Sequence, residues 1–423
     1  MIELAKRAKA ASTPLSDTSV ELRNHALLAM AEALRVHSAE IGEANGRDLE
    51  ASRDLGDALQ KRLVFDEKKL RGVVDGLEAL ASLPDPLGRV LTRTELAEGL
   101  HLRRVTCPIG VIGIIFEARP DALVQISSLC LKSGNAVLLK GGKEALHTNR
   151  ILAEVIRNAT EAVGLPGDWI QLLETREEVN GMLRLNEYID LIVPRGSNSF
   201  VKYIMENTTI PVLGHSAGLC HLFLDASANL EKAVAIAVDA KTQAPATCNT
   251  VETLLVHKDA ASRLLPAVCD ALRNAGVELR GDEMSRSIVT WMKPATEEDW
   301  STEYLALILS VKVVDDLAAA IAHINRFGSH HTDAIVTEDA AAAELFQRRV
   351  DSADVFWNAS TRFADGYRFG LGAEVGISTS KIHARGPVGL EGLTIYKWLL
   401  SGQGDTVAPF ADGRRAFTHR QEG

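Results

Sequence analysis

The chain has 423 residues, of which 46% are hydrophobic and 24% charged, as in folded globular proteins, and its length predicts two or three domains. A formal net charge of −10 argues against nucleic acid or an acidic membrane as the main partner, although it leaves room for a local basic pocket that binds a phosphorylated ligand. The five cysteines include no C-x-x-C pair, which indicates neither a disulfide framework nor a zinc site, and no apolar stretch resembles a signal peptide or a membrane span. We therefore expect a protein of the reducing cytoplasm.

The N-terminal region is expected to be helical. Apolar side chains such as Leu27, Ala31 and Leu34 recur at helical spacing before residue 83, and Pro84 and Pro86 then end the pattern. Residues 88–105 alternate in places between apolar and polar side chains, which predicts extended structure such as a hairpin.

From Ile109 onward, the pattern is that of strands alternating with helices. The run from Ile109 to Phe116 is almost wholly apolar, as expected for a strand that is buried on both faces of a parallel sheet. Pro120 can begin a helix because the first helical position needs no N–H. Further elements expected before residue 226 are helices over 120–132 and 144–163 and strands over 136–139, 170–173, 191–193, 212–213 and 220–224.

The alternation continues in the second half of the chain and predicts a second α/β unit. Helices are expected over 229–240, 259–275, 315–326 and 339–350, and strands over 251–256, 311–314 and 334–336. Strands and helices in this order predict a doubly wound α/β fold. The tail from about residue 386 has no core of its own, so we expect it to pack on another domain or subunit.

Cys248 is the first candidate for chemistry, because it lies on a loop between an expected helix and an expected strand. Its neighbours Ala246, Thr247, Asn249 and Thr250 are small or polar, so substrate could reach the thiol. The alternative is a structural cysteine, since a free cysteine often acts as a small buried hydrophobe.

Two glycine-containing turns are candidate nucleotide sites. The fingerprints G-x-G-x-x-G and Walker A are both absent. In Lys140-Gly-Gly-Lys143 the glycines allow close approach and the lysines could meet hydroxyl or phosphate groups, although an ordinary turn with solvated lysines is the alternative. In 194–199 a Gly-Ser turn opens a helix and suits a phosphate, with an ordinary helix cap by Ser197 or Asn198 as the alternative. The histidines show no metal-binding spacing, so we expect no metal.

In combination, these features resemble the aldehyde dehydrogenase superfamily: a strand leading to Pro120, a strand ending in Lys140 and, later, the loop cysteine Cys248. Further segments resemble one branch of that superfamily, the γ-glutamyl phosphate reductases, over nearly the whole chain. They are Phe116-Glu-Ala-Arg-Pro-Asp121, Leu139-Lys-Gly-Gly-Lys143, Val193-Pro-Arg-Gly196, Gly218-Leu-Cys-His221, His331-Thr-Asp-Ala-Ile-Val-Thr-Glu338, Gly370-Leu-Gly-Ala-Glu-Val-Gly-Ile-Ser378 and Ala384-Arg-Gly-Pro-Val-Gly-Leu-Glu-Gly-Leu393.

The resemblance implies roles for individual residues. Cys248 would be the nucleophile, and backbone N–H groups near it, helped by the side chain of Asn249, would hold the oxyanion. Lys140 would contact the cofactor ribose, and Glu303 would hold the nicotinamide ribose. The remaining cofactor residues are Gly142, Lys143 and the turn beneath the pyrophosphate, Gly196 and Ser197.

Three departures from the hydrolytic members of the superfamily indicate the direction of the reaction. Ala118 stands where the oxyanion asparagine is usual, and Val212 stands where the general base is usual. Without that base, water would not be activated against a thioester, which fits reduction of an acyl phosphate. Lys143 replaces a glutamate that is frequent in NAD-dependent relatives, and its charge favours the 2′-phosphate of NADP.

The resemblance therefore implies NADPH-dependent reduction of L-glutamyl 5-phosphate to L-glutamate 5-semialdehyde, the second step of proline biosynthesis from glutamate. Arg119 and Arg362 are the candidates for binding the anionic substrate. The alternatives are an acylating aldehyde dehydrogenase that uses another activated acid, and a catalytically silent dinucleotide-binding protein with a scaffold or regulatory role.

The implied architecture has three parts and more than one subunit. Residues 1–87 and 107–226 would form the dinucleotide-binding domain, residues 227–385 the catalytic domain, and residues 88–106 with 386–423 an oligomerisation flap and tail. A homodimer or homotetramer is expected, and a glutamate 5-kinase could hand over the labile substrate.

Overall fold

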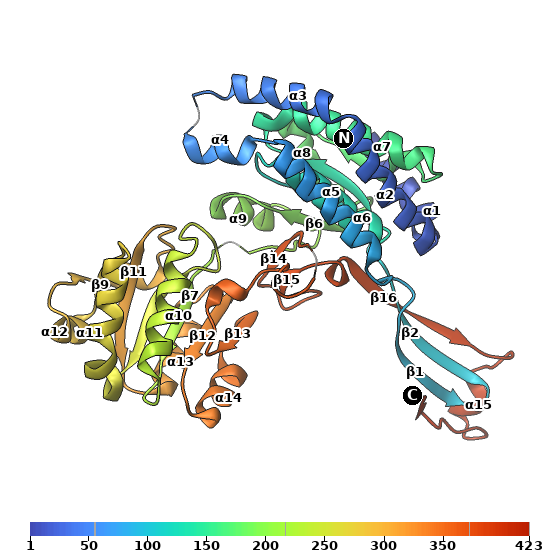
Figure 1. Ribbon diagram of the computed structural model, residues 1–423. Coiled ribbons are helices and arrows are strands. Elements are labelled where there is room, and N and C mark those ends of the chain that lie inside the picture. The colour runs from blue at the N-terminus through green and yellow to red at the C-terminus, as the bar shows by residue number, and fades with distance from the viewer. Residues whose placement is uncertain (55, 216, 372, 423) are drawn as a thin grey trace.

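The computed structural model describes residues 1–54, 56–215, 217–371 and 373–422 of the chain, so Gly372 of the segment 370–378 lies outside it. The strands of these residues form two parallel sheets and two small antiparallel sheets. Figure 1 shows each parallel sheet in its own lobe and a long arm that projects away from both. The predicted doubly wound α/β class is confirmed.

The first lobe is built on a four-stranded parallel sheet in the order β5-β4-β3-β6. Every residue of β3 and β4 is buried, as expected for strands that are covered on both faces. Helices α6 and α7 follow β3 and β4 in the same direction along the sheet and so share one face, while α1 and α8 contact each other on the other face. The bounds are β3 Val111–Ile115, β4 Ala136–Lys140, β5 Ile170–Leu172, β6 Leu191–Pro194, α1 Ile2–Ser16, α6 Pro120–Lys132, α7 Leu146–Ala162, α8 Arg176–Met182 and α9 Asn198–Glu206.

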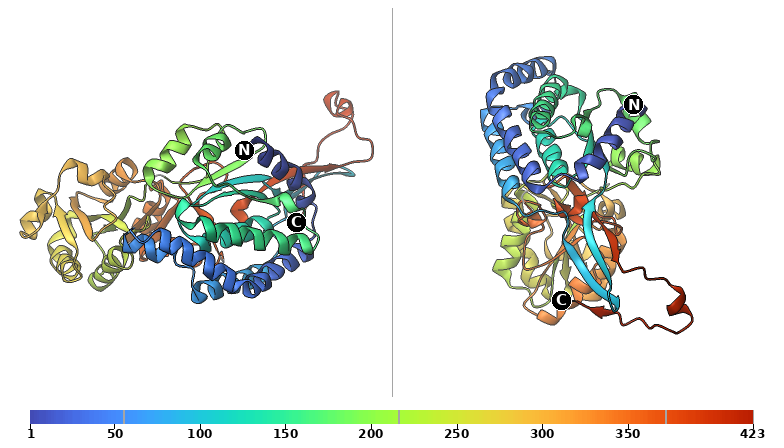
Figure 2. Two further views of the ribbon diagram at one scale, coloured as in Figure 1. Left: turned by 90° about the horizontal axis from the view of Figure 1, so that it is seen from above. Right: turned by 90° about the vertical axis from the view of Figure 1, so that its right-hand side faces the viewer.

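The region before residue 83 is helical, as predicted. Its helices α2, α3 and α5 form an outer layer against α6 and α7 (Figure 2). Ser19 caps the start of α2, since its side chain accepts a hydrogen bond from the Leu22 N–H, and Asp66 caps α5 in the same way. The bounds are α2 Val20–Val36, α3 Ser38–Ala51, α4 Asp57–Leu63 and α5 Glu67–Ser82.

The second lobe contains a seven-stranded parallel sheet in the order β10-β9-β11-β8-β7-β12-β13. The chain enters at β7, builds outward through β8, and later returns to add β12 on the other side of β7. The direction of winding therefore reverses at β7. The bounds are β7 Cys220–Leu224, β8 Val251–His257, β9 Glu278–Gly281, β10 Lys293–Pro294, β11 Ile308–Val314, β12 Thr332–Val336, β13 Asp354–Trp357, α10 Leu230–Thr242, α11 Lys258–Asn274, α12 Glu283–Ile288, α13 Leu317–Phe327 and α14 Ala340–Arg349.

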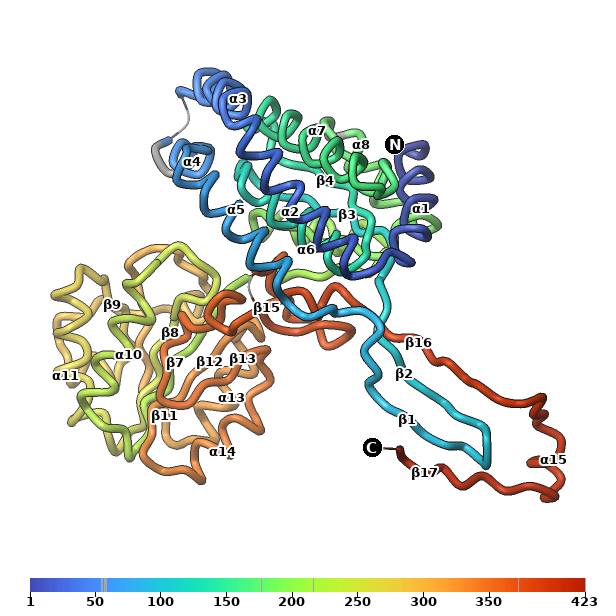
Figure 3. Tube along the Cα trace, turned by 45° about the vertical axis from the view of Figure 1, so that its right-hand side comes forward, coloured from blue at the N-terminus to red at the C-terminus, as the bar shows by residue number. Residues whose placement is uncertain are grey.

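The projecting arm is an antiparallel sheet in the order β16-β2-β1-β17 (Figure 3). This sheet contains both the predicted hairpin near residue 100 and the C-terminal tail. The tail has no core of its own and is held by the pairing of β16 with β2. The bounds are β1 Val90–Ala97, β2 Leu100–Pro108, β16 Thr394–Ser401, β17 Arg420–Gln421 and the short helix α15 Ala408–Ala411.

A short hairpin of β14 (Gly376–Ser378) and β15 (Gly386–Val388) connects the second lobe to the arm. Val375 and Val388 on it belong to the hydrophobic core of the first lobe, so the chain returns to that lobe before it enters the arm. β7, which precedes the expected boundary at residue 226, lies in the second sheet. The expected domain limits stay a prediction.

Single-turn 3-10 helices complete the described elements: η1 Lys143–Ala145, η2 Gly167–Trp169, η3 Glu297–Ser301, η4 Thr361–Phe363 and η5 Glu391–Leu393. Two sequence-based expectations differ from the structure in detail. The strand expected over 212–213 is a single bridge between Val212 and Ile192, and strands β9, β10 and β13 were not predicted. Within the described residues, no helix combines the length and the apolar character that crossing a membrane would require.

Candidate active site

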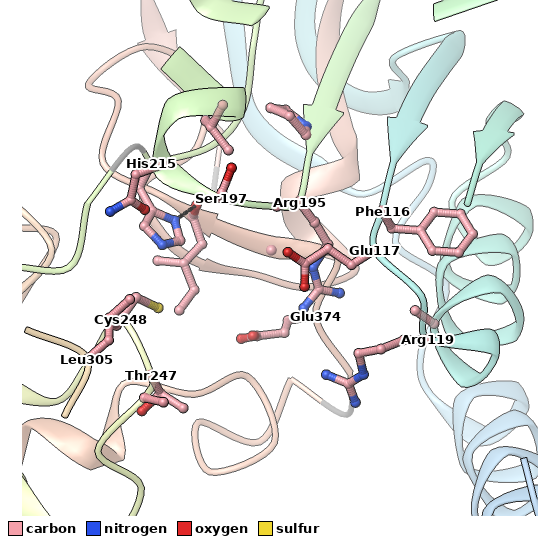
Figure 4. A pocket seen from close by; sticks show the side chains of 18 of the residues that line it. Phe116, Glu117, Arg119, Arg195, Ser197, His215, Thr247, Cys248, Leu305 and Glu374 are labelled. Carbon is pink, nitrogen blue, oxygen red and sulfur yellow. Dashed lines mark hydrogen bonds between the residues drawn. The ribbon is translucent and has the colours of Figure 1, made fainter. Parts of the chain in front are cut away.

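Two adjoining cavities of about 790 and 760 Å³ lie at the carboxyl edge of the first sheet. They share four lining residues, Phe116, Glu117, Arg195 and Gly196, which come directly after β3 and β6. This edge of a doubly wound sheet is where nucleotides bind. The larger cavity contains Cys248 (Figure 4) and is completed by residues that precede strands of the second sheet.

Cys248 lies on the turn between α10 and β8, which is held by hydrogen bonds within the loop. The Thr247 hydroxyl donates to the Ala244 carbonyl at 2.8 Å, and the Thr250 N–H donates to the Thr247 carbonyl at 3.0 Å. Cys248 is partly exposed to the cavity, whereas Cys130, Cys220 and Cys269 are buried. Cys248 therefore differs from these three cysteines in lining a cavity, which favours the chemical interpretation.

The surroundings of the Cys248 thiol favour its protonated form. Burial, with a smaller contribution from the carboxylates of Glu374 and Glu303, raises the pKa of Cys248 to about 12, while Arg362 acts in the opposite sense. At neutral pH the sulfur therefore carries its proton. A nucleophile in this state needs a base beside it when it attacks.

His215 is placed where it can act as such a base, and no motif in the sequence singles it out. Its Nδ1–H donates to the Ile377 carbonyl at 3.0 Å, which leaves Nε2 as the unprotonated nitrogen of the neutral ring. Burial lowers the pKa of His215, so the ring is neutral near pH 7. A ring nitrogen of His215 lies within 4.8 Å of the Cys248 sulfur, and both side chains face the cavity (Figure 4).

The second cavity brings together the predicted residues of the first glycine turn. Lys140 is buried at the end of β4, and Lys143 is exposed in η1. Gly142 between them packs closely against residue 118, since a Cβ at position 142 would lie 2.8 Å from the Ala118 backbone nitrogen. The turn therefore has no room for a larger residue at position 142.

The N-terminus of α9 opens into the larger cavity. Ser197 is the N-cap residue, but its side chain makes no capping hydrogen bond; its hydroxyl lies 3.2 Å from that of Ser199. The alternative of an ordinary cap by Ser197 is wrong, and the first N–H groups of α9 stay available. Together with the helix dipole, these groups suit a phosphate next to Gly196.

Glu303 links the N-terminus of α9 to Gly218, in the segment before β7. One carboxylate oxygen accepts a hydrogen bond from the Gly218 N–H at 2.9 Å, and the other contacts the amide of Asn198. Asn198 is therefore engaged by Glu303 rather than acting as a helix cap. This contact joins residues of the two lobes across the larger cavity.

Three arginines line the larger cavity: Arg62, Arg119 and Arg195. Arg62 pairs with Glu117 at 3.0 Å, and Arg119 pairs with Asp121 at 3.0 Å. The Arg195 guanidinium has no hydrogen bond or ion pair with any residue that the structure describes, and burial lowers its pKa. Sequence reasoning did not single out Arg195, although it adjoins the predicted Gly196 turn.

Arg362 and Asn249 lie behind the nucleophile loop and not among the residues that line the cavity. Arg362 donates to the Gln243 amide oxygen at 2.9 Å and to the Thr247 hydroxyl at 2.7 Å. Asn249 donates to the Ala364 carbonyl at 2.8 Å. Both side chains hold the loop in this structure, and their expected contact with the substrate stays a prediction.

Comparison with known proteins gives a consistent result. A model of the aldehyde dehydrogenase family matches residues 1–288. A γ-glutamyl phosphate reductase of Acetivibrio thermocellus is 56% identical over 99% of this chain and 97% of its own, and one of Pelotomaculum thermopropionicum is 57% identical over 100% and 97%. A crystal structure of γ-glutamyl phosphate reductase from Thermotoga maritima, 42% identical, superposes with a TM-score of 0.94 over 96% of this chain and 99% of that one.

Proposed function

Because the chain belongs to the aldehyde dehydrogenase family, in its γ-glutamyl phosphate reductase branch, we propose that the cavity around Cys248 is where the substrate is reduced. The reaction is the NADPH-dependent conversion of L-glutamyl 5-phosphate to L-glutamate 5-semialdehyde and phosphate, a step of proline biosynthesis. One observation carries the assignment of the site: a partly exposed thiol shares a cavity with an unoccupied histidine nitrogen, an unpaired arginine and an open helix N-terminus.

The residues around the two cavities fit NADPH. The free N–H groups of α9, with Gly196 and Ser197, suit the pyrophosphate, and Lys140 and Glu303 suit the two riboses. Lys143, exposed on the second cavity, suits the 2′-phosphate by its charge. When bound there, NADPH supplies the hydride.

Cys248 forms and releases the covalent intermediate. As its sulfur attacks the acyl carbon of the substrate, the thiol proton passes to His215 Nε2, the C–O bond to phosphate breaks, and a thioester remains. Reduction of the thioester gives a thiohemiacetal, and breaking of its C–S bond releases the aldehyde. The sulfur then regains a proton, which His215 can return.

Arg119 and Arg195 bind the phosphate and the α-carboxylate of the substrate in this proposal. Both line the larger cavity, and among the described residues Arg195 has no hydrogen-bond partner, although the charge of Glu374 favours its cationic form. A planar guanidinium suits both anions. Arg362 and Asn249 act one step removed, by fixing the loop that carries the nucleophile.

The test is the reverse reaction, because the acyl phosphate is labile. With glutamate semialdehyde, NADP and phosphate, the wild type should form NADPH only when phosphate is present, and Cys248→Ala should form none. NADPH formation without phosphate would instead indicate hydrolysis, with water activated by one of the carboxylates that line the cavity, such as Glu374.

We also propose a homo-oligomer assembled through the arm. Three apolar or aromatic side chains on β16 are about half exposed: Tyr396, Trp398 and Leu400. β16 is also an edge strand, with β2 on one side only. An exposed apolar edge strand of this kind can pair with a strand of a second subunit.

Hand-over of the acyl phosphate from a glutamate 5-kinase is a further proposal, motivated by the lability of the substrate.

A further inference from the structure

Three potential metal ligands meet beside the nucleophile. One ring nitrogen of His215, one of His331 and the sulfur of Cys248 all lie within 4.8 Å of one another. They come from three separate places: the segment before β7, the residue before β12 and the loop before β8. Because these strands are neighbours in the second sheet, their leading residues gather at one edge.

His331 has a buried ring nitrogen that makes no hydrogen bond to any described residue. The side chain is fully buried, and its Nε2 has no hydrogen-bond partner among the described residues. Its other nitrogen, Nδ1, lies 2.8 Å from the Thr332 hydroxyl, which in turn donates to the Asp354 carboxylate at 3.3 Å. Since the Thr332 hydroxyl already donates its hydrogen to Asp354, its oxygen accepts a hydrogen bond from the Nδ1–H of His331. Nε2 is therefore the unprotonated nitrogen of the ring, and its lone pair is buried without a hydrogen-bond donor among the described residues.

His215 is oriented in the same manner. Its Nδ1–H donates to the Ile377 carbonyl, so its Nε2 is also unprotonated. A histidine that binds a metal typically donates its other N–H to a carbonyl, hydroxyl or carboxylate, which fixes the tautomer and the ring orientation. Both histidines already have that support. The rings meet edge to face, with their centroids 4.9 Å apart.

We propose that His215, Cys248 and His331 form a site for a zinc-class divalent cation, and that occupation of the site reversibly inactivates the enzyme. Two imidazoles and a thiolate are the ligands that Zn²⁺ prefers, and the cavity leaves a fourth position for solvent. Donor atoms around a tetrahedral zinc lie about 3.5 Å apart, given bonds of about 2.0 to 2.3 Å. The three donor atoms lie within 4.8 Å of one another, so each pair must approach by at most about 1.3 Å to reach that separation.

Binding releases one proton, because the thiol of Cys248 becomes the thiolate ligand and both histidines are already neutral. The Cys248 sulfur and the His215 nitrogen are then coordinated to the metal. The sulfur can therefore no longer attack the acyl carbon of the substrate. The inhibitory effect depends on the proposed role of Cys248 as the nucleophile, whereas binding of the metal does not. The two can therefore be tested separately.

The binding test uses Co²⁺ as a spectroscopic probe on the intact protein. We expect one Co²⁺ per chain, with a sulfur-to-cobalt charge-transfer band that is absent from Cys248→Ser and weakened at least tenfold in His331→Gln. His323→Gln is the matched control, because His323 is also buried with an unpartnered Nε2 but lies outside the cluster. No band in the wild type, or a band of equal affinity in His331→Gln, would overturn the site.

A second measurement needs no variant and so does not depend on the folding of His331→Gln. Zn²⁺ at one equivalent should slow alkylation of Cys248 by iodoacetamide at least tenfold, and a chelator should restore the original rate. The same equivalent of Zn²⁺ should lower reductase activity at least tenfold. Unchanged alkylation would overturn the site. Full activity of a Zn²⁺-loaded protein that shows the cobalt band would overturn the inhibition alone, and activity of Cys248→Ala would overturn the proposed function while leaving the site intact.

Discussion

Gly218 packs directly against the backbone of Cys248, so closely that only glycine fits. A Cβ at residue 218 would lie 2.1 Å from the Cys248 carbonyl oxygen and 2.4 Å from its Cα. The same glycine donates its N–H to Glu303 at 2.9 Å. Gly218 therefore sets the distance between the nucleophile loop and the carboxylate that we assign to the nicotinamide ribose.

Replacement of this glycine should damage catalysis. In Gly218→Ala the methyl group meets backbone atoms, which cannot move aside as a flexible side chain can, so the Cys248 loop must shift. A shift of about 1 Å at a reacting group can cost about 10²-fold, so we expect kcat to fall by about that factor. Steady-state kinetics measure the loss.

The matched control is Gly42→Ala on the exposed side of α3, where a Cβ would meet nothing within 4 Å. It should keep the wild-type kcat and gain about 0.5 to 1 kcal/mol in stability, because alanine favours helix. Wild-type kcat in Gly218→Ala would show that the loop tolerates the displacement.

Arg362 should affect kcat more than KM. Its guanidinium bonds to Thr247 and Gln243 on the nucleophile loop. Arg362→Ala removes both bonds, and we expect kcat to fall about 10- to 100-fold with a smaller change in the KM for the acyl phosphate. Arg362→Lys should rescue little, since lysine cannot reproduce the planar fork. A large rise in KM at constant kcat would instead show that Arg362 binds the substrate directly, as the sequence-based hypothesis states.

Lys143 should set the preference between cofactors. In Lys143→Glu the charge at the second cavity is reversed, and the 2′-phosphate of NADPH would be repelled. We expect the ratio of kcat/KM for NADPH to that for NADH to fall at least tenfold, or about 1.4 kcal/mol. The control is Lys202→Glu, which changes another exposed lysine, on α9 and outside both cavities, and should keep the ratio. An unchanged ratio in Lys143→Glu would remove Lys143 from the cofactor site.

The buried histidine His323 should make folding sensitive to acid. Burial lowers its pKa to about 3, below the value of about 6.5 expected in the unfolded chain. The unfolded chain therefore binds more protons between those values, so stability is complete above pH 6.5 and falls as the pH drops toward 3. Between pH 6.5 and 5.0 this residue should cost about 2 kcal/mol.

Urea unfolding at pH 7.5 and 5.0 measures that effect. His323→Phe removes the titrating group but keeps a ring beside Trp300 and Phe327, so it should lose less stability on acidification than the wild type does. An equal loss in both proteins would assign the acid sensitivity to other groups.

Most of the fold could be predicted from the sequence, because its elements depend on local patterns. β3 and β4 are continuous apolar runs, and Pro120 begins α6 where expected. The short strands β9, β10 and β13 were missed, since two to four residues contain too little periodicity to distinguish a strand from a loop.

The residues of the candidate site also fall into two groups, those that the sequence predicted and those that it did not. Cys248 and Lys140 follow expected strands or helices, and motif and position were enough to locate them. His215, Arg195 and His331 could not be linked to Cys248, because they meet it only through the order of strands in two sheets. The orientation of Arg362 depends on hydrogen bonds to Gln243 and Thr247, which no spacing in the sequence reveals.

The most direct measurement of the central claim is the mass of the intact protein after incubation with glutamate semialdehyde and NADP without phosphate. We predict one γ-glutamyl adduct per chain, carried by Cys248, absent from Cys248→Ala and stable until phosphate is added. Discharge by phosphate would identify a thioester that is protected from water. An adduct on another residue, or rapid loss of the adduct in water alone, would contradict the claim that Cys248 serves an acyl-phosphate reductase.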